Sequence, residues 1–324
     1  MSRSVPQVVS LAAVAIGVLL FAVTVYYIDL DETIASARQL GLAFPLILIP
    51  GTCWHLLRTW GWAVAFPEDS RPAYTRLFRV RLAADAIAFF TVRGIAGEPL
   101  KVLLLYDRVK PEITTAAVAL ERLAFAVIGI IIAALISLAA VTRLSLPDAW
   151  DTLFTLLIVG AVLALGFGVV IARGESGDYL GRLVNLLDRR HRLAGMRVVR
   201  FILDVEDVLL QLVRGDRHRL ITLTILAAVC YALMAIEVWL VLWAVGAPST
   251  VIEALTVETF ARLASVASAA IPGNIGALEA SNAAVVAALG LAGGGALALA
   301  RRIRALLWAA AGLALYPRVR ERRQ

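Results

Sequence analysis

The chain has 324 residues, of which 61% are hydrophobic and only 17% are charged, and its mean hydropathy is +0.85. Ordinary soluble domains hold about 45–50% apolar and about 25% charged residues, so this composition excludes a soluble globular enzyme and predicts a polytopic membrane protein. The net charge of +7 comes almost wholly from arginine. We attribute it to cytoplasmic loops and expect no nucleic-acid partner, because such loops are enriched in basic residues.

Six apolar segments are predicted to cross the membrane, since each is long enough to traverse ~30 Å of hydrocarbon as a helix. They cover residues 8–28, 42–66, 113–141, 152–172, 220–245 and 296–316. Arginines follow the second, fourth and sixth segments, so these ends and both chain termini are expected in the cytoplasm. Among these basic residues, Arg76, Arg79 and Arg81 place the chain after the second segment on the cytoplasmic side.

The longest polar segment, 173–219, is rich in arginine and is expected to be cytoplasmic. Apolar residues recur at helical spacing over 198–213. This pattern predicts an amphipathic helix that lies at the membrane interface or packs on the bundle. A simple connector helix is the alternative.

Two further apolar regions are interrupted by glycine or proline. The stretch Leu82–Val92 is too short to span and is followed by Gly94 and Gly97; the second break is Pro272-Gly273. Broken helices at membrane depth must be buried in protein or line a wet cavity. We therefore predict two re-entrant helical hairpins, the first entering from the cytoplasm and the second from outside.

An internal repeat relates the two breaks. A shift of 179 positions superposes Gly97 on Gly276 and Arg122 on Arg301. The order of spans and hairpin is the same in both halves and the orientation is opposite, which is the plan of an inverted repeat. The predicted fold is an all-α membrane protein with a single transmembrane domain, 1–324. Repeat 1 covers 1–145, and repeat 2 covers 146–324 including the segment 173–219.

The candidate substrate-binding residues lie at the breaks and on the helices that follow them, because an ionisable residue at membrane depth is costly and is a functional candidate. They are Arg93, Gly94, Gly97, Glu98, Lys101, Glu121, Arg122, Pro272, Gly273, Asn274, Gly276, Glu279 and Arg301. The basic members suit a phosphate headgroup through charge-assisted hydrogen bonds.

The two carboxylates that follow the breaks, Glu98 and Glu279, are expected to orient the cations or to carry protons. The structural alternative is that Glu98 pairs with Arg122, and Glu279 with Arg301, to hold the hairpins in place. Arg304 is expected to be an interface anchor.

The block from Gly94 to Glu98, followed by Lys101 and by Glu121-Arg122, is similar to the first motif of the lysylphosphatidylglycerol synthetase transmembrane-region family. The block from Pro272 to Glu279 resembles the second motif of these flippase-like membrane proteins. The resemblance covers essentially the whole chain, although Arg93 stands where a proline is expected. It implies a protein of the bacterial inner membrane that moves an anionic or glycan-linked lipid between leaflets. No aminoacyl-transferase domain is present in the sequence, so lipid aminoacylation is not expected.

Two other functions stay open. One is an integral-membrane lipid transferase that uses Glu98, Glu121 or Glu279 as a base, and the other is a non-transporting subunit of an envelope-lipid enzyme. No catalytic triad, nucleotide site, metal site or cofactor motif is recognised, so no enzyme activity, metal or cofactor is expected. Membrane lipids are the expected partners, and a homo-oligomer or a biosynthetic enzyme remains open as a further partner.

Overall fold

The computed structural model describes residues 40–41, 43–91, 97–173, 197–268, 271 and 276–317. Within these residues it holds ten α-helices, one short 3-10 helix and no strand. The expected all-α class is therefore confirmed. The expected first span, 8–28, lies outside the described residues.

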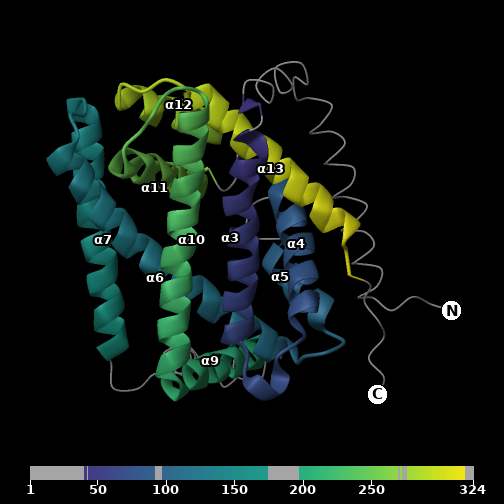
Figure 1. Ribbon diagram of the computed structural model, residues 1–324. Coiled ribbons are helices and arrows are strands. Elements are labelled where there is room, and N and C mark those ends of the chain that lie inside the picture. Colours follow the sequence, from purple (N-terminus) through teal and green to yellow (C-terminus); the bar gives the residue numbers. More distant parts are fainter. Residues whose placement is uncertain are drawn as a thin grey trace.

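The helices follow the predicted apolar segments closely, as the bounds show (Figure 1). They are α3 (Ala43–Ala65), η1 (Glu68–Ser70), α4 (Tyr74–Phe90), α5 (Gly97–Leu105), α6 (Pro111–Arg143), α7 (Asp148–Arg173), α9 (Arg197–Gly215), α10 (Arg217–Ala244), α11 (Val251–Ala267), α12 (Ala277–Ala288) and α13 (Gly294–Ala314).

Among the described residues, three helices are long and apolar enough to cross a membrane. They are Pro111–Arg143, Arg217–Ala244 and, within α7, Asp148–Phe167. The expected spans 113–141, 152–172 and 220–245 thus coincide with suitable helices. The predicted spans 42–66 and 296–316 form α3 and α13, which are not among the three helices that meet this criterion.

Local sequence signals set several helix starts. Pro111 begins α6 at a position where a proline costs no hydrogen bond. The side chain of Asp216 accepts from the backbone N–H groups of His218 and Arg219 at the start of α10. Thr250 and Glu253 form a reciprocal capping box at the start of α11. These caps define where the chain turns between helices.

The middle of the molecule is the pair α3 and α10, which lie side by side along most of their length (Figure 1). Two hydrophobic cores form at opposite ends of this pair. The first joins the C-terminal part of α3 to α4, α5, α6 and α9 and includes Trp62, Phe66 and Leu104. The second joins the C-terminal part of α10 to α11, α12 and α13 and includes Leu242 and Val285.

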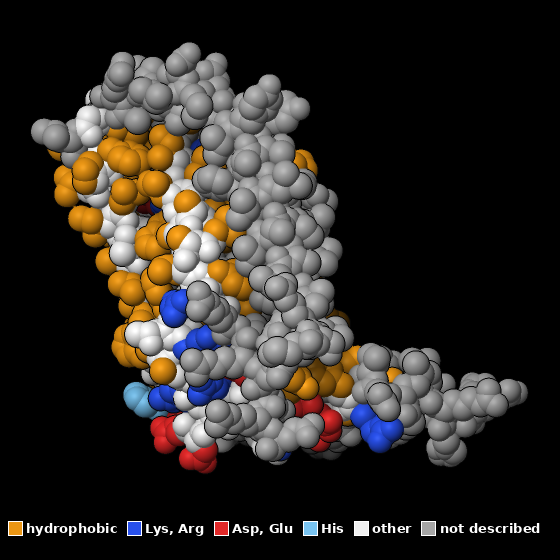
Figure 2. Space-filling model, turned by 90° about the vertical axis from the view of Figure 1, so that its right-hand side faces the viewer, with side chains coloured by type: hydrophobic (Ala, Val, Ile, Leu, Met, Phe, Trp, Pro, Cys, Tyr) orange, Lys and Arg blue, Asp and Glu red, His pale blue; other side chains and the backbone are white. Residues whose placement is uncertain are grey.

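Charged side chains gather at one end of the molecule. Figure 2 shows hydrophobic side chains along the upper and middle part of one face, whereas basic and acidic side chains gather at the lower end. That end carries η1 and α9 (Figure 1). The chain after the second predicted span and the segment 173–219 were both expected on the cytoplasmic side, and their described parts, η1 and α9, are at the same end.

The amphipathic helix α9 packs on the bundle. Leu212 on α9 is buried, and Val205, Val208 and Leu209 pack against the first core. The main contact is with α6. Of the arrangements predicted for this segment, packing on the bundle is the one observed.

The helices that flank each break pack back on each other, α4 on α5 and α11 on α12. Gly97 permits the first of these contacts, because a Cβ at this position would lie 2.8 Å from Cβ of Ala88 and 3.1 Å from the carbonyl oxygen of Ala84. At the second break, Gly276 has a φ of +79°, a conformation that favours glycine. Its N–H donates to the carboxylate of Glu279 at 2.8 Å, which caps α12.

The helix before the first break is longer than the apolar stretch from which it was predicted. Helix α4 begins at Tyr74, eight positions before the apolar stretch at Leu82. Arg81, expected among the basic residues of the cytoplasmic side, is 1% exposed inside the bundle. The physical reason is an acidic partner on another helix, Glu121 of α6, described below.

The two halves also hold each other. Helix α4 packs on α13, and α11 packs on α6. The first contact is a backbone approach: a Cβ on Gly312 of α13 would lie 2.2 Å from the carbonyl oxygen of Leu82. A helix of each half is thus covered by a helix of the other.

Candidate functional site

Two clusters of charged side chains lie inside the helical bundle. The first charge cluster comes from α3, α4, α5 and α6. Its members are Arg58, Arg81, Asp85, Glu98, Lys101, Glu121 and Arg122. The second charge cluster comes from α10, α11, α12 and α13. Its members are Glu237, Glu258, Arg262, Glu279, Asn282, Arg301, Arg302 and Arg304.

Glu121 is the hub of the first charge cluster. Its carboxylate lies 3.0 Å from a guanidinium nitrogen of Arg58 and 3.0 Å from one of Arg81. Arg81 also donates to the backbone carbonyl of Arg58 at 2.8 Å and lies 3.8 Å from Asp85. The guanidinium of Arg58 stands over the ring of Phe125 at 3.9 Å. Buried ions need such multiple partners, because desolvation is otherwise too costly.

A second chain of ion pairs in this cluster starts at the beginning of α5. Glu98 pairs with Lys101 at 3.1 Å and with Arg122 of α6. Lys101 is 2% exposed, whereas the side chain of Arg122 is 52% exposed. Arg122 is therefore the cation of this cluster that a ligand can reach most easily.

Helix α13 organises the second charge cluster. Arg301 pairs with Glu258 of α11 and donates to the side-chain oxygen of Asn282 at 3.0 Å. The neighbouring Arg302 pairs with Glu279 at the start of α12. The Glu279–Arg301 pairing predicted from the sequence is thus wrong by one position. Adjacent residues on a helix point about 100° apart, and the one that faces α12's first turn is Arg302.

Two more pairs complete the second cluster. Arg304 pairs with Glu237 of α10, whose side chain is fully buried. Arg304 therefore serves as the partner of a buried acid inside the bundle, where an interface anchor was expected. Arg262 pairs with Glu258 at 2.7 Å and stands over the ring of Tyr231 at 4.3 Å. Its side chain is 38% exposed.

In each cluster, one helix is joined to three others by ion pairs. In the first half α6 is joined by ion pairs to α3, α4 and α5. In the second half α13 is joined by ion pairs to α10, α11 and α12. The sign is reversed in the first two links of each set and kept in the third, where Glu98 and Glu279 each begin a helix and pair with an arginine.

The predicted site residues divide into three groups. The structure brings Gly97, Glu98, Lys101, Glu121 and Arg122 together around the first cluster, and Gly276, Glu279 and Arg301 around the second. Arg93, Gly94, Pro272, Gly273 and Asn274 lie outside the described residues. Among the described residues, no ion pair joins the two clusters.

Sequence reasoning left several members of the clusters out of the site. They are Arg58, Arg81, Asp85, Glu237, Glu258, Arg262, Asn282, Arg302 and Arg304. Two of them have the spacing of the predicted repeat: Arg58 and Glu237 are 179 positions apart, as are Arg122 and Arg301. Their opposite charges hide the match from a comparison by residue type.

The described part of the chain contains no recognisable metal site. No group of three or more His, Cys, Asp or Glu residues there is arranged to hold a metal ion. The two cysteines, Cys53 and Cys230, are free thiols. The described site is thus a pair of ion-pair clusters.

Apolar helices and ionised groups held inside the bundle define a helical membrane protein. The chain belongs to the family described as Lysylphosphatidylglycerol synthase TM region, whose model matches residues 10–314. This match confirms the resemblance seen in the two sequence blocks and relates the protein to the handling of membrane lipids. Comparison with curated proteins and with solved structures gave no match.

Proposed function

We propose that the protein is a lipid flippase that moves an anionic or glycan-linked lipid of phospholipid type between the leaflets of the bacterial inner membrane. The observation that carries the proposal is an excess of positive charge in each cluster. Among the described residues, the first cluster holds Arg58, Arg81, Lys101 and Arg122 against Asp85, Glu98 and Glu121. The second holds Arg262, Arg301, Arg302 and Arg304 against Glu237, Glu258 and Glu279.

An uncompensated cation inside a membrane protein is costly, and an anionic ligand relieves that cost. Arginine is suited to phosphate because its planar fork can donate two parallel hydrogen bonds. The half-exposed cations Arg122 and Arg262 are the first contacts for such a headgroup. The family's link to lipid handling supports a lipid as the source of the anion.

Transport between leaflets needs two alternating states, and an inverted repeat supplies them by symmetry. Helices α3, α4, α5 and α6 correspond in order and contacts to α10, α11, α12 and α13. The reciprocal packing of α4 on α13 and of α11 on α6 supports a two-fold relation between the halves. In this proposal the two breaks are re-entrant hairpins that enter from opposite sides, and six spans complete a multi-pass fold with both termini in the cytoplasm.

In the proposed cycle a basic cavity near the midplane is exposed first to one side of the membrane and then to the other. The headgroup exchanges for the internal partners of the arginines, while the lipid tails stay in the bilayer. Glu98 and Glu279 each lie in the first turn of a helix and pair with an arginine of another helix. Protonation of either glutamate would therefore release its arginine for the headgroup. The protein forms no covalent intermediate in this scheme.

Reconstitution into vesicles tests the proposal. Purified protein should accelerate the translocation of fluorescent phosphatidylglycerol or of a glycan-linked lipid over that of phosphatidylcholine. Arg122→Ala should reduce the rate at least about tenfold without unfolding the protein, because a half-exposed ion pair contributes only about 0–1 kcal/mol. Arg143→Ala, an exposed arginine at the end of the same helix, is the matched control.

Translocation that is absent for every lipid class, or that is unchanged by Arg122→Ala, rejects the flippase proposal. Mass spectrometry of the recovered lipids provides a second reading of the same vesicles. Covalently altered lipid would favour the integral-membrane transferase.

A further inference from the structure

His55 of α3 is a buried ionisable side chain that belongs to neither charge cluster. It is 8% exposed, and its Nδ1 atom is buried without a hydrogen-bond partner. Buried polar atoms in native proteins nearly always have a partner, so an unpaired ring nitrogen calls for an explanation. An imidazole is also the side chain that most readily gains and loses a proton near neutral pH.

On one side, the ring of His55 is connected to the first charge cluster through Trp54. The indole of Trp54 meets the imidazole edge-on, with 4.8 Å between centroids. The guanidinium of Arg58 stands over the same indole at 5.6 Å. Arg81 in turn donates to the backbone carbonyl of Arg58 at 2.8 Å. The ring therefore lies next to the arginines that share Glu121.

On the other side, the ring is connected to the second charge cluster through α13. The ring of Trp308 lies 4.3 Å from that of His55. Arg304 is one turn before Trp308 and packs on Gly51, one turn before His55: a Cβ on Gly51 would lie 2.8 Å from Cδ of Arg304. His55 thus lies between the two clusters, which no ion pair joins within the described residues.

Charged groups of both clusters are close enough to act on the ring through their charges. They are Arg58 on α3, Arg81 and Asp85 on α4, and Arg304 on α13. Glu121 of α6 and Glu237 of α10 act through these arginines, with which they form ion pairs. A positive charge on the ring is repelled by the three arginines and attracted by Asp85. Trp308 also attracts it, since an indole attracts a cation within about 6 Å of its centroid.

The charge that His55 can carry therefore depends on what neutralises the arginines. A phosphate bound to Arg58, Arg81 or Arg304 cancels part of their repulsion and lets the ring bind a proton more tightly. Linkage makes the effect reciprocal, so a proton on His55 tightens the binding of the anion by the same factor.

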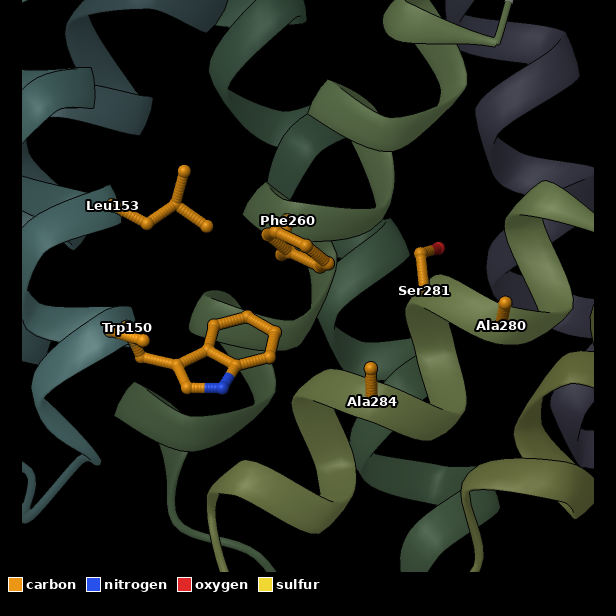
Figure 3. A pocket seen from close by; sticks show the side chains of 7 residues that line it. Trp150, Leu153, Phe260, Ala280, Ser281 and Ala284 are labelled. Carbon is orange, nitrogen blue, oxygen red and sulfur yellow. The ribbon is translucent and has the colours of Figure 1, made fainter.

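An apolar groove between α7 and the pair α11 and α12 provides no such linkage. Trp150 and Leu153 lie on one side of it, and Phe260 and Ala284 lie on the other (Figure 3). Its lining holds no ionisable side chain, so it can neither bind a proton nor attract an anion.

We infer that His55 is a proton-binding site and that it takes up a proton together with the anionic headgroup of a lipid. The proton comes from water on the side to which the cavity is open, joins the unprotonated ring nitrogen, and returns to water on the other side when the lipid leaves. The inference rests on the proposed function in naming a moved lipid as the source of the anion. It makes the flippase a symporter of protons and lipid.

Nitrogen NMR tests the linkage on the unaltered protein, because the chain has only three histidines. Protein with ¹⁵N-labelled imidazole rings is titrated in nonionic detergent with dihexanoylphosphatidylglycerol or with dihexanoylphosphatidylcholine. His55→Gln identifies the signal of His55. Its midpoint should lie at least about 0.7 pH units higher with phosphatidylglycerol, a fivefold change in proton affinity that is at the lower end of coupling between sites. His218, exposed on α10, gives the shift due to micelle charge, which is subtracted.

Transport provides the second measurement. In vesicles that contain the protein, an acidic outer side should accelerate the inward movement of fluorescent phosphatidylglycerol at least about fivefold. A protonophore should abolish the acceleration. His55→Gln should remove the response to the gradient, whereas His218→Gln, the matched control, should keep it.

The outcomes separate this inference from the proposed function. A protein that translocates phosphatidylglycerol without any response to the gradient overturns the inference and leaves the flippase proposal intact. So does a His55 midpoint that is the same with both lipids, or a full gradient response in His55→Gln. The expected shift of His55 in a protein that translocates no lipid class rejects the flippase and retains the linkage of proton and headgroup.

A folding defect in the variant does not remove the test. Size-exclusion profiles in detergent show whether His55→Gln, or His55→Asn as its substitute, folds. If both fail, His191→Gln and His218→Gln assign the signal of His55 by elimination. The titration and the gradient response of the unaltered protein then decide the inference.

Discussion

The carboxylate of Glu121 lies 3.0 Å from the guanidinium of Arg81, and both side chains are buried. Arg58 shares the same carboxylate at 3.0 Å. Removing the charge of Glu121 would leave two buried cations without their common partner. One partner removed from a buried pair typically costs about 3–5 kcal/mol. Glu121→Gln should therefore lower the free energy of unfolding by roughly that amount, measured by denaturation with SDS in mixed micelles.

The control for Glu121 is on the same helix. Glu112 lies in the first turn of α6 and makes no ion pair among the described residues. Glu112→Gln should change the free energy of unfolding by less than about 0.5 kcal/mol, as is usual for surface substitutions. Equal effects of the two variants would mean that Glu121 is not the hub of a buried network.

The pair of Glu237 and Arg304 distinguishes a structural ion pair from a transport site. Arg304→Met alone leaves Glu237 buried and unpaired, so a loss of about 3–5 kcal/mol is expected. Glu237→Gln together with Arg304→Met should restore most of it, because buried pairs can often be replaced by neutral residues of similar volume. The double-mutant cycle gives the coupling energy. If the restored double variant translocates lipid normally, the pair is structural; if it is stable but inactive, it belongs to the transport path.

Close packing of α4 on α13 depends on the missing side chain at Gly312. A Cβ there would lie 2.2 Å from a backbone carbonyl oxygen, which cannot rotate away. Gly312→Ala should destabilise the protein by about 1–3 kcal/mol, the usual range for overpacking. Gly160→Ala on α7 meets nothing within 4 Å and should be neutral or stabilise by about 0.5–1 kcal/mol, because alanine is the better helix former. Unfolding in mixed micelles compares the two.

The attachment of α9 can be tested through Leu212, which is 5% exposed in the first core. Leu212→Ala should destabilise the contact by about 2–5 kcal/mol and raise hydrogen exchange of the α9 amides at least tenfold. Ile202→Ala, on the exposed side of the same helix, should leave that exchange unchanged. Rapid hydrogen exchange of the α9 amides in the unaltered protein would instead indicate that α9 lies on the membrane surface and is not packed on the bundle.

The positions of the helices were predictable because a long apolar run has few alternatives in a membrane. The predicted segment 113–141 lies within α6 (Pro111–Arg143). The predicted segment 220–245 begins inside α10 (Arg217–Ala244) and ends one residue after it. Segment 42–66 likewise matches α3. Such runs are set by local composition, which a sequence states directly.

The partners inside the site were less predictable. The pair Glu98–Arg122 was foreseen and is observed. Arg301 was assigned to Glu279, yet it faces Glu258 and Asn282 while its neighbour Arg302 takes Glu279. Which of two adjacent arginines faces an acid depends on the rotation of one helix against another, and no pattern along one chain contains that angle. The burial of Arg81 was not predicted for a related reason, since it depends on an acid 40 positions away.

The cover that α13 provides for α4 has a consequence for synthesis. α4 is made early and α13 is the last described helix to leave the ribosome, so the backbone surface around Leu82 stays without its partner until nearly the whole chain has been made. Nascent chains truncated before Gly294 should therefore bind membrane chaperones and be degraded. In such chains, Arg81 and Glu121 would have to keep their pairing without the helix that closes over α4.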